Sequence, residues 1–398
     1  MQSLTWNEVR AHRLARQFLH SPAPRMSVVE VVRNVCGIHA QVMPSAELSL
    51  GLRVEGLTRH QLATELWERR SLVKTYGVRG TVHLLPSDEL ALWLAAFRAN
   101  SRRNDGRRLE YLGLTPEQMN DMVAAIGDAL EVEQRLTREE LGVEIARRVG
   151  VWATERRASA FGGQWPIWMS AIGAAAHAGT LCFGPNDGTR VTFEPPARWI
   201  GAQPAIDGDE ALRAVFRRYL ASYGPATHAE FAQWFAMPAS HAREVARSLR
   251  AWVEEVDVEG RRALQLADDR PARGARAARS VMLLPRFDPY VVGSHPRDEL
   301  IPPSSAKHAL ATGILPKRAR TGREFLAGPM PVLLVDGQVA GVWEQHRARG
   351  RIAMRVQTFV RLTADDRREL ESRVDRIGLV LGEDAVLSFG AITTRPHL

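Results

Sequence analysis

The sequence predicts a mainly α fold with β-hairpin wings (α+β): three tandem winged-helix domains followed by a C-terminal β-barrel-like module. Two patterns support this prediction. Three times along the chain, a group of amphipathic helices is followed by two short strands and a tight turn. After a polar, basic linker, strand-like runs replace the helical periodicity. The expected boundaries are 1–105, 106–205 and 206–266 for the three domains, 267–280 for the linker and 281–398 for the module.

The first domain is expected to contain three helices and a hairpin. Apolar residues recur at helical spacing over 5–19, and a second helix ends at Cys36-Gly37. Thr58 is placed to cap a helix over 59–69. The strands 72–76 and 81–85 then form the first hairpin. Between the second and third helices lies a polar segment, closed by Pro44, with no helical or strand pattern of its own.

The second and third domains repeat this order. Helices are expected over 88–100, 115–128, 137–149 and 164–178, followed by a hairpin at 181–193 that turns at Asn186-Asp187-Gly188. Helices over 209–222, 227–235 and 239–252, the second capped by Thr227, precede a hairpin that turns at Glu259-Gly260. The final module is expected to hold strands at 281–285, 352–362 and 385–389, a pair of strands over 331–343 that turns at Val335-Asp336-Gly337, and one helix at 363–377.

Composition limits the partners. The chain has 398 residues and a formal charge of +8, and all but three of its 53 Lys+Arg residues are arginine. This charge favours an anionic partner, nucleic acid first, although arginine richness also accompanies GC-rich genomes. No stretch approaches the roughly 20 apolar residues of a spanning helix, and no signal-peptide core is present, so we expect a cytoplasmic protein without a membrane partner.

Motif searches exclude several chemistries. Two cysteines, Cys36 and Cys182, are too few for a disulfide scaffold or a four-cysteine zinc site. Phosphate-binding loops, dinucleotide fingerprints and nucleophile elbows are missing from the sequence. We therefore expect no metal and no cofactor.

Two places could carry function. His39 and Gln41 flank an alanine, and in extended backbone residues two apart point the same way, so their side chains would converge. The alternative is an exposed loop without function. Arg243, Arg247 and Arg250 have the spacing of one helix face, which favours contact with a phosphate backbone or, equally, a solvated surface.

Four segments together resemble the AlkZ/YcaQ group of winged-helix bacterial DNA glycosylases. They are GIHAQ…AELSLGLRV (37–54), YGVRGTVHLLP (76–86), LCFGPNDGTRVTF (181–193) and LLPRFDPYVVG (283–293) with VDGQVAGVW (335–343). The resemblance implies winged helices in a C shape with a β-barrel-like module, and excision of alkylated bases, notably N7-alkylguanine. The catalytic Gln-aliphatic-Gln motif then falls on His39 and Gln41, with histidine in place of the first glutamine. This variant resembles the branch associated with bulky adducts of the trioxacarcin or pluramycin kind and with self-resistance.

The same resemblance assigns the remaining residues. His39 would be a general base or position water, and Gln41 would hold the water or the deoxyribose. Asn186, Asp187 and Arg190 would probe DNA from the 181–193 hairpin, or serve as an ordinary wing. Arg79 and His83 are expected in a strand of the first domain, where both could line the pocket, with contact to phosphate or a salt bridge favoured for Arg79. Asp288 is expected at the pocket or in a structural role.

The expected partner is double-stranded DNA carrying alkylated bases, bound by a monomer that is nucleoid-associated. Two alternatives stay open on the sequence. One is a non-catalytic winged-helix regulator, although no dimerisation element is evident. The other is a glycosylase of broader scope that removes N7-methylguanine.

Overall fold

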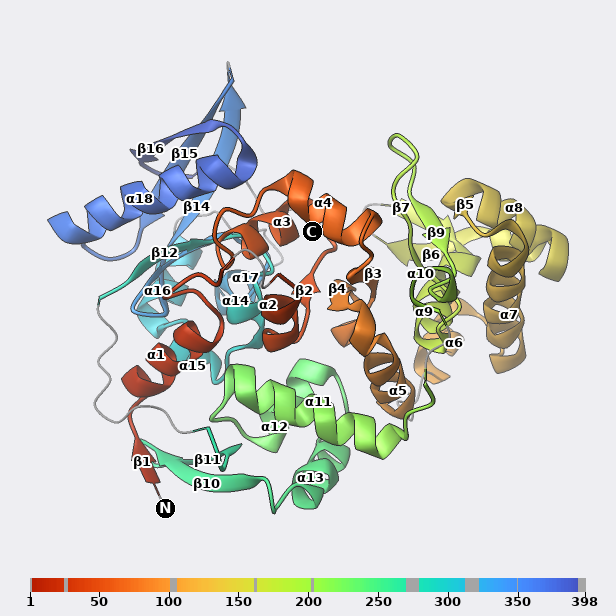
Figure 1. Cartoon of the computed structure of the whole chain (residues 1–398), viewed down its shortest axis with the longest axis horizontal. Coiled ribbons are helices and arrows are strands. Elements are labelled where there is room, and N and C mark those ends of the chain that lie inside the picture. Colours follow the sequence, from red (N-terminus) through yellow and green to blue (C-terminus); the bar gives the residue numbers. More distant parts are fainter. Residues whose placement is uncertain are drawn as a thin grey trace. The chain divides into compact units, whose positions relative to one another are not determined.

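The computed structural model describes residues 2–24, 28–100, 106–160, 163–201, 204–269, 279–311, 322–348 and 350–392. Most of the predicted linker, 270–278, lies outside them. The chain forms two compact units (Figure 1). The first unit comprises 1–62, 216–234 and 239–398, and the second comprises 63–215 and 235–238. Each unit is thus assembled from segments far apart in the sequence, while the contiguous domain boundaries stay a prediction.

The first unit contains the N-terminal helices and the C-terminal module. Its elements are β1 (Gln2–Leu4), α1 (Trp6–Arg16), α2 (Val28–Asn34), β2 (Ile38–His39), α3 (Met43–Gly51), α13 (Ala239–Ser248), β10 (Val253–Val258), β11 (Arg261–Leu266), β12 (Val281–Leu284), α14 (Pro289–Gly293), α15 (Arg297–Leu300), α16 (Pro303–Ala311), α17 (Gly322–Leu326), β13 (Val332–Val335), β14 (Gln338–Ala348), β15 (Arg351–Thr358), α18 (Ala364–Leu381) and β16 (Asp384–Phe389). Three helices contain points where the chain passes between units: α4 (Arg59–Trp67), α11 (Gly208–Tyr223) and α12 (His228–Phe235).

The C-terminal module is built on one sheet of the order β12-β13-β14-β15-β16, which confirms the predicted strands. Neighbours are antiparallel except β15 and β16, which are parallel because α18 carries the chain back between them. Its outer strands, β12 and β16, are the sheet's two edges, so the sheet is an open half-barrel. Figure 1 shows α18 along this sheet, where it packs on β12 and β16.

The N-terminal helices complete the core of this module. Leu14 of α1 and Leu48 of α3 belong to the same buried cluster as the sheet residues. At Gly51, the last residue of α3, a Cβ atom would overlap the side chain of Val380 in α18. Glycine at this position therefore lets the two helices approach closely.

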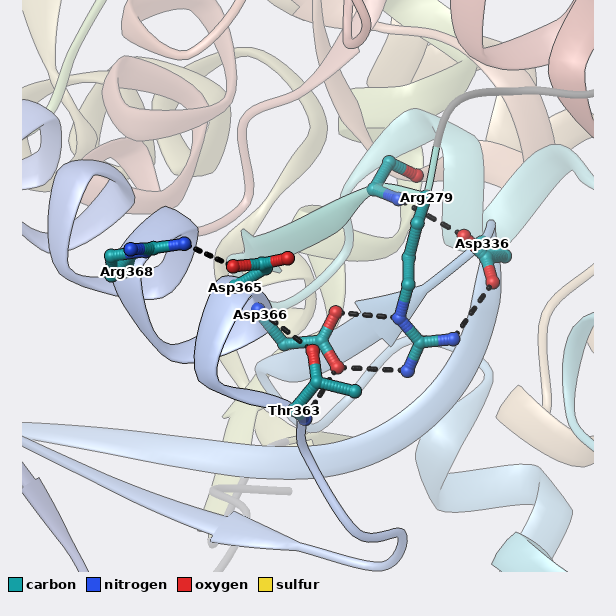
Figure 2. A network of polar contacts seen from close by, with 7 residues as sticks. Arg279, Asp336, Thr363, Asp365, Asp366 and Arg368 are labelled. Carbon is teal, nitrogen blue, oxygen red and sulfur yellow. Dashed lines mark hydrogen bonds and ion pairs between the residues drawn. The ribbon is translucent and has the colours of Figure 1, made fainter.

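Polar contacts fix the start of α18 to the start of β12 (Figure 2). Thr363 and Asp366 form a capping box, and the Arg279 guanidinium donates to both Asp366 oxygens at 2.6 and 2.8 Å. Arg279 also lies 3.6 Å from Asp336, whose carboxylate accepts the Ser280 N–H at 3.0 Å. The hydrogen bonds from Arg279 lower the pKa of Asp366 to about 2. Helix α18 thus begins where a charged network ties it to the sheet.

A second sheet of the first unit joins the N-terminus to a later hairpin. The predicted hairpin is confirmed as β10 and β11, and both turn residues, Glu259 and Gly260, have positive φ, as hairpin turns of this length require. The unpredicted strand β1 pairs in parallel with β10. Thr227 caps α12 as expected, in a capping box with Glu230.

The second unit is richer in helix. Its elements are β3 (Leu72–Tyr76), β4 (Val82–Pro86), α5 (Leu90–Asn100), α6 (Gly106–Leu112), α7 (Pro116–Glu133), β5 (Leu136–Thr137), α8 (Arg138–Val149), β6 (Arg156–Ala160), β7 (Gly163–Pro166), α9 (Ile172–Ala178), β8 (Cys182–Phe183), β9 (Thr192–Glu194) and α10 (Ala197–Ile200). The hairpin of β3 and β4 is confirmed, as are the helices that match α5, α7 and α8.

One predicted helix, 164–178, is wrong over its first half. Residues 163–166 form β7, which pairs antiparallel with β6, and the α-helix begins only at Ile172. Pro166 explains the difference, because a proline disfavours helical backbone at the residue before it, here Trp165. The aromatic side chain of Trp165 also suits a strand.

The core of the second unit encloses a histidine. The His177 ring of α9 stacks on Phe97 of α5, with centroids 4.8 Å apart, and its Nε2 is enclosed without a hydrogen-bond partner among the described residues. Burial, and secondarily the positive charge of Arg98, lower the pKa of His177 to about 4. His177 is therefore neutral in the folded protein at neutral pH.

The depressed pKa of His177 predicts an acid-sensitive core. The pKa of His177 is about 4 in the folded protein and 6.5 in a model peptide, so below pH 6.5 the unfolded chain binds a proton that the folded protein does not. The free energy of unfolding is therefore highest above pH 6.5 and falls as the pH drops toward 4. We expect a loss of about 3 kcal/mol between pH 7 and pH 4, measured by denaturant unfolding. His177→Phe keeps a ring against Phe97 and should flatten this dependence; an unchanged dependence would contradict the assignment.

Candidate active site

The segment that carries His39 and Gln41 starts from a helix end. Helix α2 is closed by Cys36 and Gly37, with φ of 61° and 93°, and the Gly37 N–H donates to Val32 O at 2.9 Å. The Val35 carbonyl just before them accepts the Tyr223 hydroxyl at 2.9 Å. This left-handed closure sends the chain directly into β2. His39 is thus placed by a helix cap rather than by a free loop.

His39 is enclosed by protein, with 8% of its surface exposed, between the buried residues Ile38 and Ala40. Its ring stacks on Phe287 with centroids 4.5 Å apart and an interplanar angle of 27°. Gln41, two residues on, is exposed. The alternative of a histidine in an exposed loop is therefore wrong, while the convergence of His39 and Gln41 stays a prediction.

Helix α3, which follows, was not predicted from the sequence. No regular structure was expected around Pro44, but proline is tolerated in the first turn of a helix, where its missing N–H would have no partner. Val42 is the N-cap and supplies no capping side chain. The exposed Gln41 therefore directly precedes the positive end of a helix.

A buried ion pair connects the end of α3 to the segment that holds Phe287. The Arg53 guanidinium donates to both oxygens of Asp288 at 2.7 Å, and Ser49 Oγ donates to the same carboxylate at 2.9 Å. Arg53 and Asp288 are fully buried. Asp288 also caps α14 by accepting the Tyr290 N–H at 3.0 Å. Because Asp288 is enclosed and bonded to these donors, it orders the site and does not line an open pocket.

Phe287 itself adopts an unusual backbone. Its φ is 61°, in the left-handed region that non-glycine residues rarely occupy, and its N–H donates to Gly328 O at 2.7 Å. Asp288, the next residue, is held by Arg53, so the backbone is held both at Phe287 and at the residue that follows it. This ring was absent from the residues singled out in sequence, although it lies in one of the four signature segments.

The second unit holds two of the predicted residues near one turn. Arg79, with φ of 60°, is half-buried in the 3-10 turn between β3 and β4, so the expectation that it lies in a strand is wrong. His83 is in β4, 4% exposed, with Nδ1 2.9 Å from Thr81 O and its ring against Gly77. Both roles expected for these residues stay predictions.

The 181–193 segment is confirmed as a hairpin, with β8 and β9 paired. At its tip, Asp187 and Arg190 exchange two backbone hydrogen bonds of 3.0 and 2.9 Å and form an ion pair. Gly188 supplies the positive φ, 60°, of the turn. Asn186, Asp187 and Arg190 are all exposed, as a DNA-probing role would require.

The basic helix of the first unit is shorter than predicted. Helix α13 ends at Ser248, so Arg250 lies beyond it and the one-face spacing holds only for Arg243 and Arg247. Both side chains are exposed, and the Arg243 Nε lies 3.5 Å from His228 Nε2. Burial first, and then the charges of Arg243 and Arg247, lower the pKa of His228.

Comparison with known proteins identifies the family. Residues 32–379 match the family described as DNA glycosylase AlkZ-like. The chain belongs to this family. A relative from Streptomyces sahachiroi, an interstrand DNA cross-link repair glycosylase, is 32% identical over 351 residues, 85% of this chain and 88% of the relative. A solved structure, the DNA glycosylase AlkZ of the same organism, has a TM-score of 0.76 and 28% identity over 98% of this chain and 100% of that chain.

The AlkZ-like chain is therefore a DNA glycosylase, and both His39 and Phe287 lie inside the matched region. Within the described ranges, no group of three or more His, Cys, Asp or Glu side chains could hold a metal ion. None of the helices described is both long and apolar enough to cross a bilayer.

The Arg53–Asp288 pair predicts a large stability effect. Asp288→Asn leaves the Arg53 charge buried without a counterion, so we expect the free energy of unfolding to fall by about 3–5 kcal/mol. Chemical denaturation measures the loss. Asp298→Asn is the matched control, since its ion pair with Arg323 at 2.6 Å is exposed and should contribute less than about 1 kcal/mol. Equal losses in both variants would contradict the assigned role.

Proposed function

We propose that this glycosylase hydrolyses the N-glycosidic bond of alkylated nucleotides, bulky N7-alkylguanines above all, in duplex DNA. The observation that carries the proposal is His39, stacked on Phe287 two residues before Gln41 in a chain of the AlkZ-like family. The relative named for interstrand cross-link repair supports a large lesion over a simple one. The enzyme is monofunctional and leaves an abasic site.

The chemistry of the lesion explains the residue types. An N7-alkylated guanine carries a positive charge and leaves without a strong general acid, so the enzyme must position water and stabilise a sugar of oxocarbenium character. His39 orients that water and accepts its proton, since an imidazole can titrate near neutrality. Gln41, exposed at the end of the same segment, holds the water or the deoxyribose through its amide.

Exposed parts of the fold supply the contacts to DNA. In this proposal, each group of helices followed by a hairpin is a winged-helix domain, and the exposed tip at Asn186, Asp187 and Arg190 enters a groove of the duplex. Arg243 and Arg247 contact phosphates from α13. The protein acts as a monomer at the bacterial nucleoid in the cytoplasm, and it protects its host against a DNA-alkylating natural product of the trioxacarcin or pluramycin kind.

The two alternatives fare differently. Membership of a glycosylase family leaves the non-catalytic regulator without support. The broader glycosylase, which would remove N7-methylguanine as readily, is decided by one experiment. Duplexes that carry N7-methylguanine or a bulky N7-guanine adduct are incubated with the enzyme, and abasic sites are cleaved with alkali. Excision of the bulky adduct alone supports the proposal, and comparable rates on both lesions favour the broader activity.

His39 and Gln41 predict a separation of catalysis from binding. His39→Ala and Gln41→Ala should each slow single-turnover excision by about 100- to 10,000-fold, because a positioned base contributes that much. The affinity for adducted duplex should change little. His39→Gln restores the residue common in the family and should retain part of the rate by orienting water without accepting its proton.

The matched control is His60→Ala, an exposed histidine of the same unit. It should excise at the wild-type rate. Circular dichroism establishes that each variant is folded. Wild-type rates for both His39→Ala and Gln41→Ala would refute the catalytic assignment.

The α13 arginines predict a salt effect. Removing one cation that pairs with a phosphate should reduce the slope of log affinity against log salt concentration by about 0.9 on duplex DNA. The double variant Arg243→Ala, Arg247→Ala should therefore flatten the slope by nearly 2, while the excision rate at saturating enzyme stays unchanged. A slope equal to that of the wild type would show that these arginines do not contact the phosphates of bound DNA.

A further inference from the structure

Arg286 is a half-buried arginine without an acidic partner. It directly precedes Phe287, and no ion pair or hydrogen bond of its side chain occurs within the part of the chain that the structure describes. Burial alone lowers the pKa of its guanidinium. Removing a guanidinium from water without a counterion costs free energy, so the free protein holds a cation in an unfavourable place.

The surroundings of Arg286 form a cavity of about 220 Å³. Pro44 and Ser45, from the first turn of α3, line one part of it, and Trp343 and Gln345 of β14 line another. The cavity is therefore lined by residues three and four positions after Gln41 and by the residue that directly precedes Phe287. Polar groups and one cation therefore face this cavity. They come from two separate segments, one a few residues after the His39–Gln41 motif and the other next to Phe287, which stacks on His39.

The carboxylate in this cavity contacts other side chains. Glu344 also lines the cavity, but its Oε1 lies 3.4 Å from His346 Nε2 and 3.6 Å from Arg355 Nη1. Among the described residues, no ion pair joins Glu344 to Arg286. The Arg286 charge is thus left for an external anion.

The anion available at this place follows from the substrate class. A guanidinium pairs with phosphate through two parallel hydrogen bonds, and phosphodiesters flank every deoxyribose of DNA. We propose that Arg286 binds the phosphodiester next to the deoxyribose whose base is excised. This inference rests on the proposed function and adds a positioning residue to it: Arg286 fixes the strand, and His39 and Gln41 act on the sugar that the strand presents.

The position of Arg286 along the chain places that phosphodiester close to the reacting sugar. The Cα atoms of Arg286 and Phe287 are one peptide, about 3.8 Å, apart. The Phe287 ring contacts the His39 ring at 4.5 Å between centroids. In this proposal, a strand held by Arg286 passes His39 within one or two nucleotides, so the contact sets the orientation of the sugar as well as the affinity.

Single-turnover excision with neutral phosphates tests the contact. The substrate is the alkylated duplex that the wild-type enzyme excises, prepared with one methylphosphonate in turn at each of three phosphates on either side of the lesion. Arg286→Ala should raise the half-saturating enzyme concentration about 10- to 100-fold, the range for hydrogen bonds to a charged group. Arg286→Lys keeps the charge but not the paired geometry and should recover part of this loss.

The decisive result is non-additivity. The control variant is Arg361→Ala, which removes an exposed arginine of the same unit. At one phosphate within two nucleotides of the lesion, the methylphosphonate should weaken substrate binding by the wild type and by this control, but not by Arg286→Ala. Equal effects of every methylphosphonate on wild type and Arg286→Ala would overturn the inference while leaving the proposed function intact. A wild-type enzyme that excises no alkylated duplex would overturn the proposed function itself, and the Arg286 role with it.

Discussion

The ion pair between Arg53 and Asp288 is the constraint on which the geometry of the site depends. Two charges without solvent contact persist only when their hydrogen bonds are nearly complete, and here both Asp288 oxygens receive Arg53 while Ser49 and the Tyr290 N–H supply further donors. The pair spans 235 residues of sequence. It fixes the end of α3 to the start of α14, and Phe287, one residue before Asp288, is thereby held where its ring covers His39.

The C-terminal module also holds the helix that follows the His39–Gln41 segment. Leu48 of α3 lies in the core of the module's sheet, and the Arg376 guanidinium of α18 donates to Gly51 O and Val54 O at 2.9 and 2.6 Å. An N-terminal motif that is held by C-terminal residues keeps its geometry only when both parts of the chain are present. This arrangement accounts for a family match that extends from residue 32 to residue 379 and is not confined to the motif.

Features that depend on residues close together in the chain could be predicted from the sequence. The caps at Thr58 and Thr227 and the turns at Gly188 and Gly260 follow from local chemistry and are confirmed. Contacts between distant segments had no local signal: neither Arg53 nor Phe287 was singled out. Helix α3 was missed for a different reason, because Pro44 resembles a helix breaker unless the helix is known to start one residue earlier.

The net charge of +8 does not show which arginines can hold DNA, because many of them already pair with carboxylates of the chain. Arg279 is bound to Asp366, Arg53 to Asp288 and Arg138 to Glu139. A guanidinium with a carboxylate partner must lose that partner before it can hold a phosphate, so it contributes little to binding. The arginines that matter are those whose charge the folded chain leaves without an acidic partner among the described residues. By that criterion Arg243 and Arg247 are the proposed contacts to phosphates regardless of base sequence, whereas Arg286, half-buried next to Phe287, is the proposed contact that positions the strand relative to the reacting sugar.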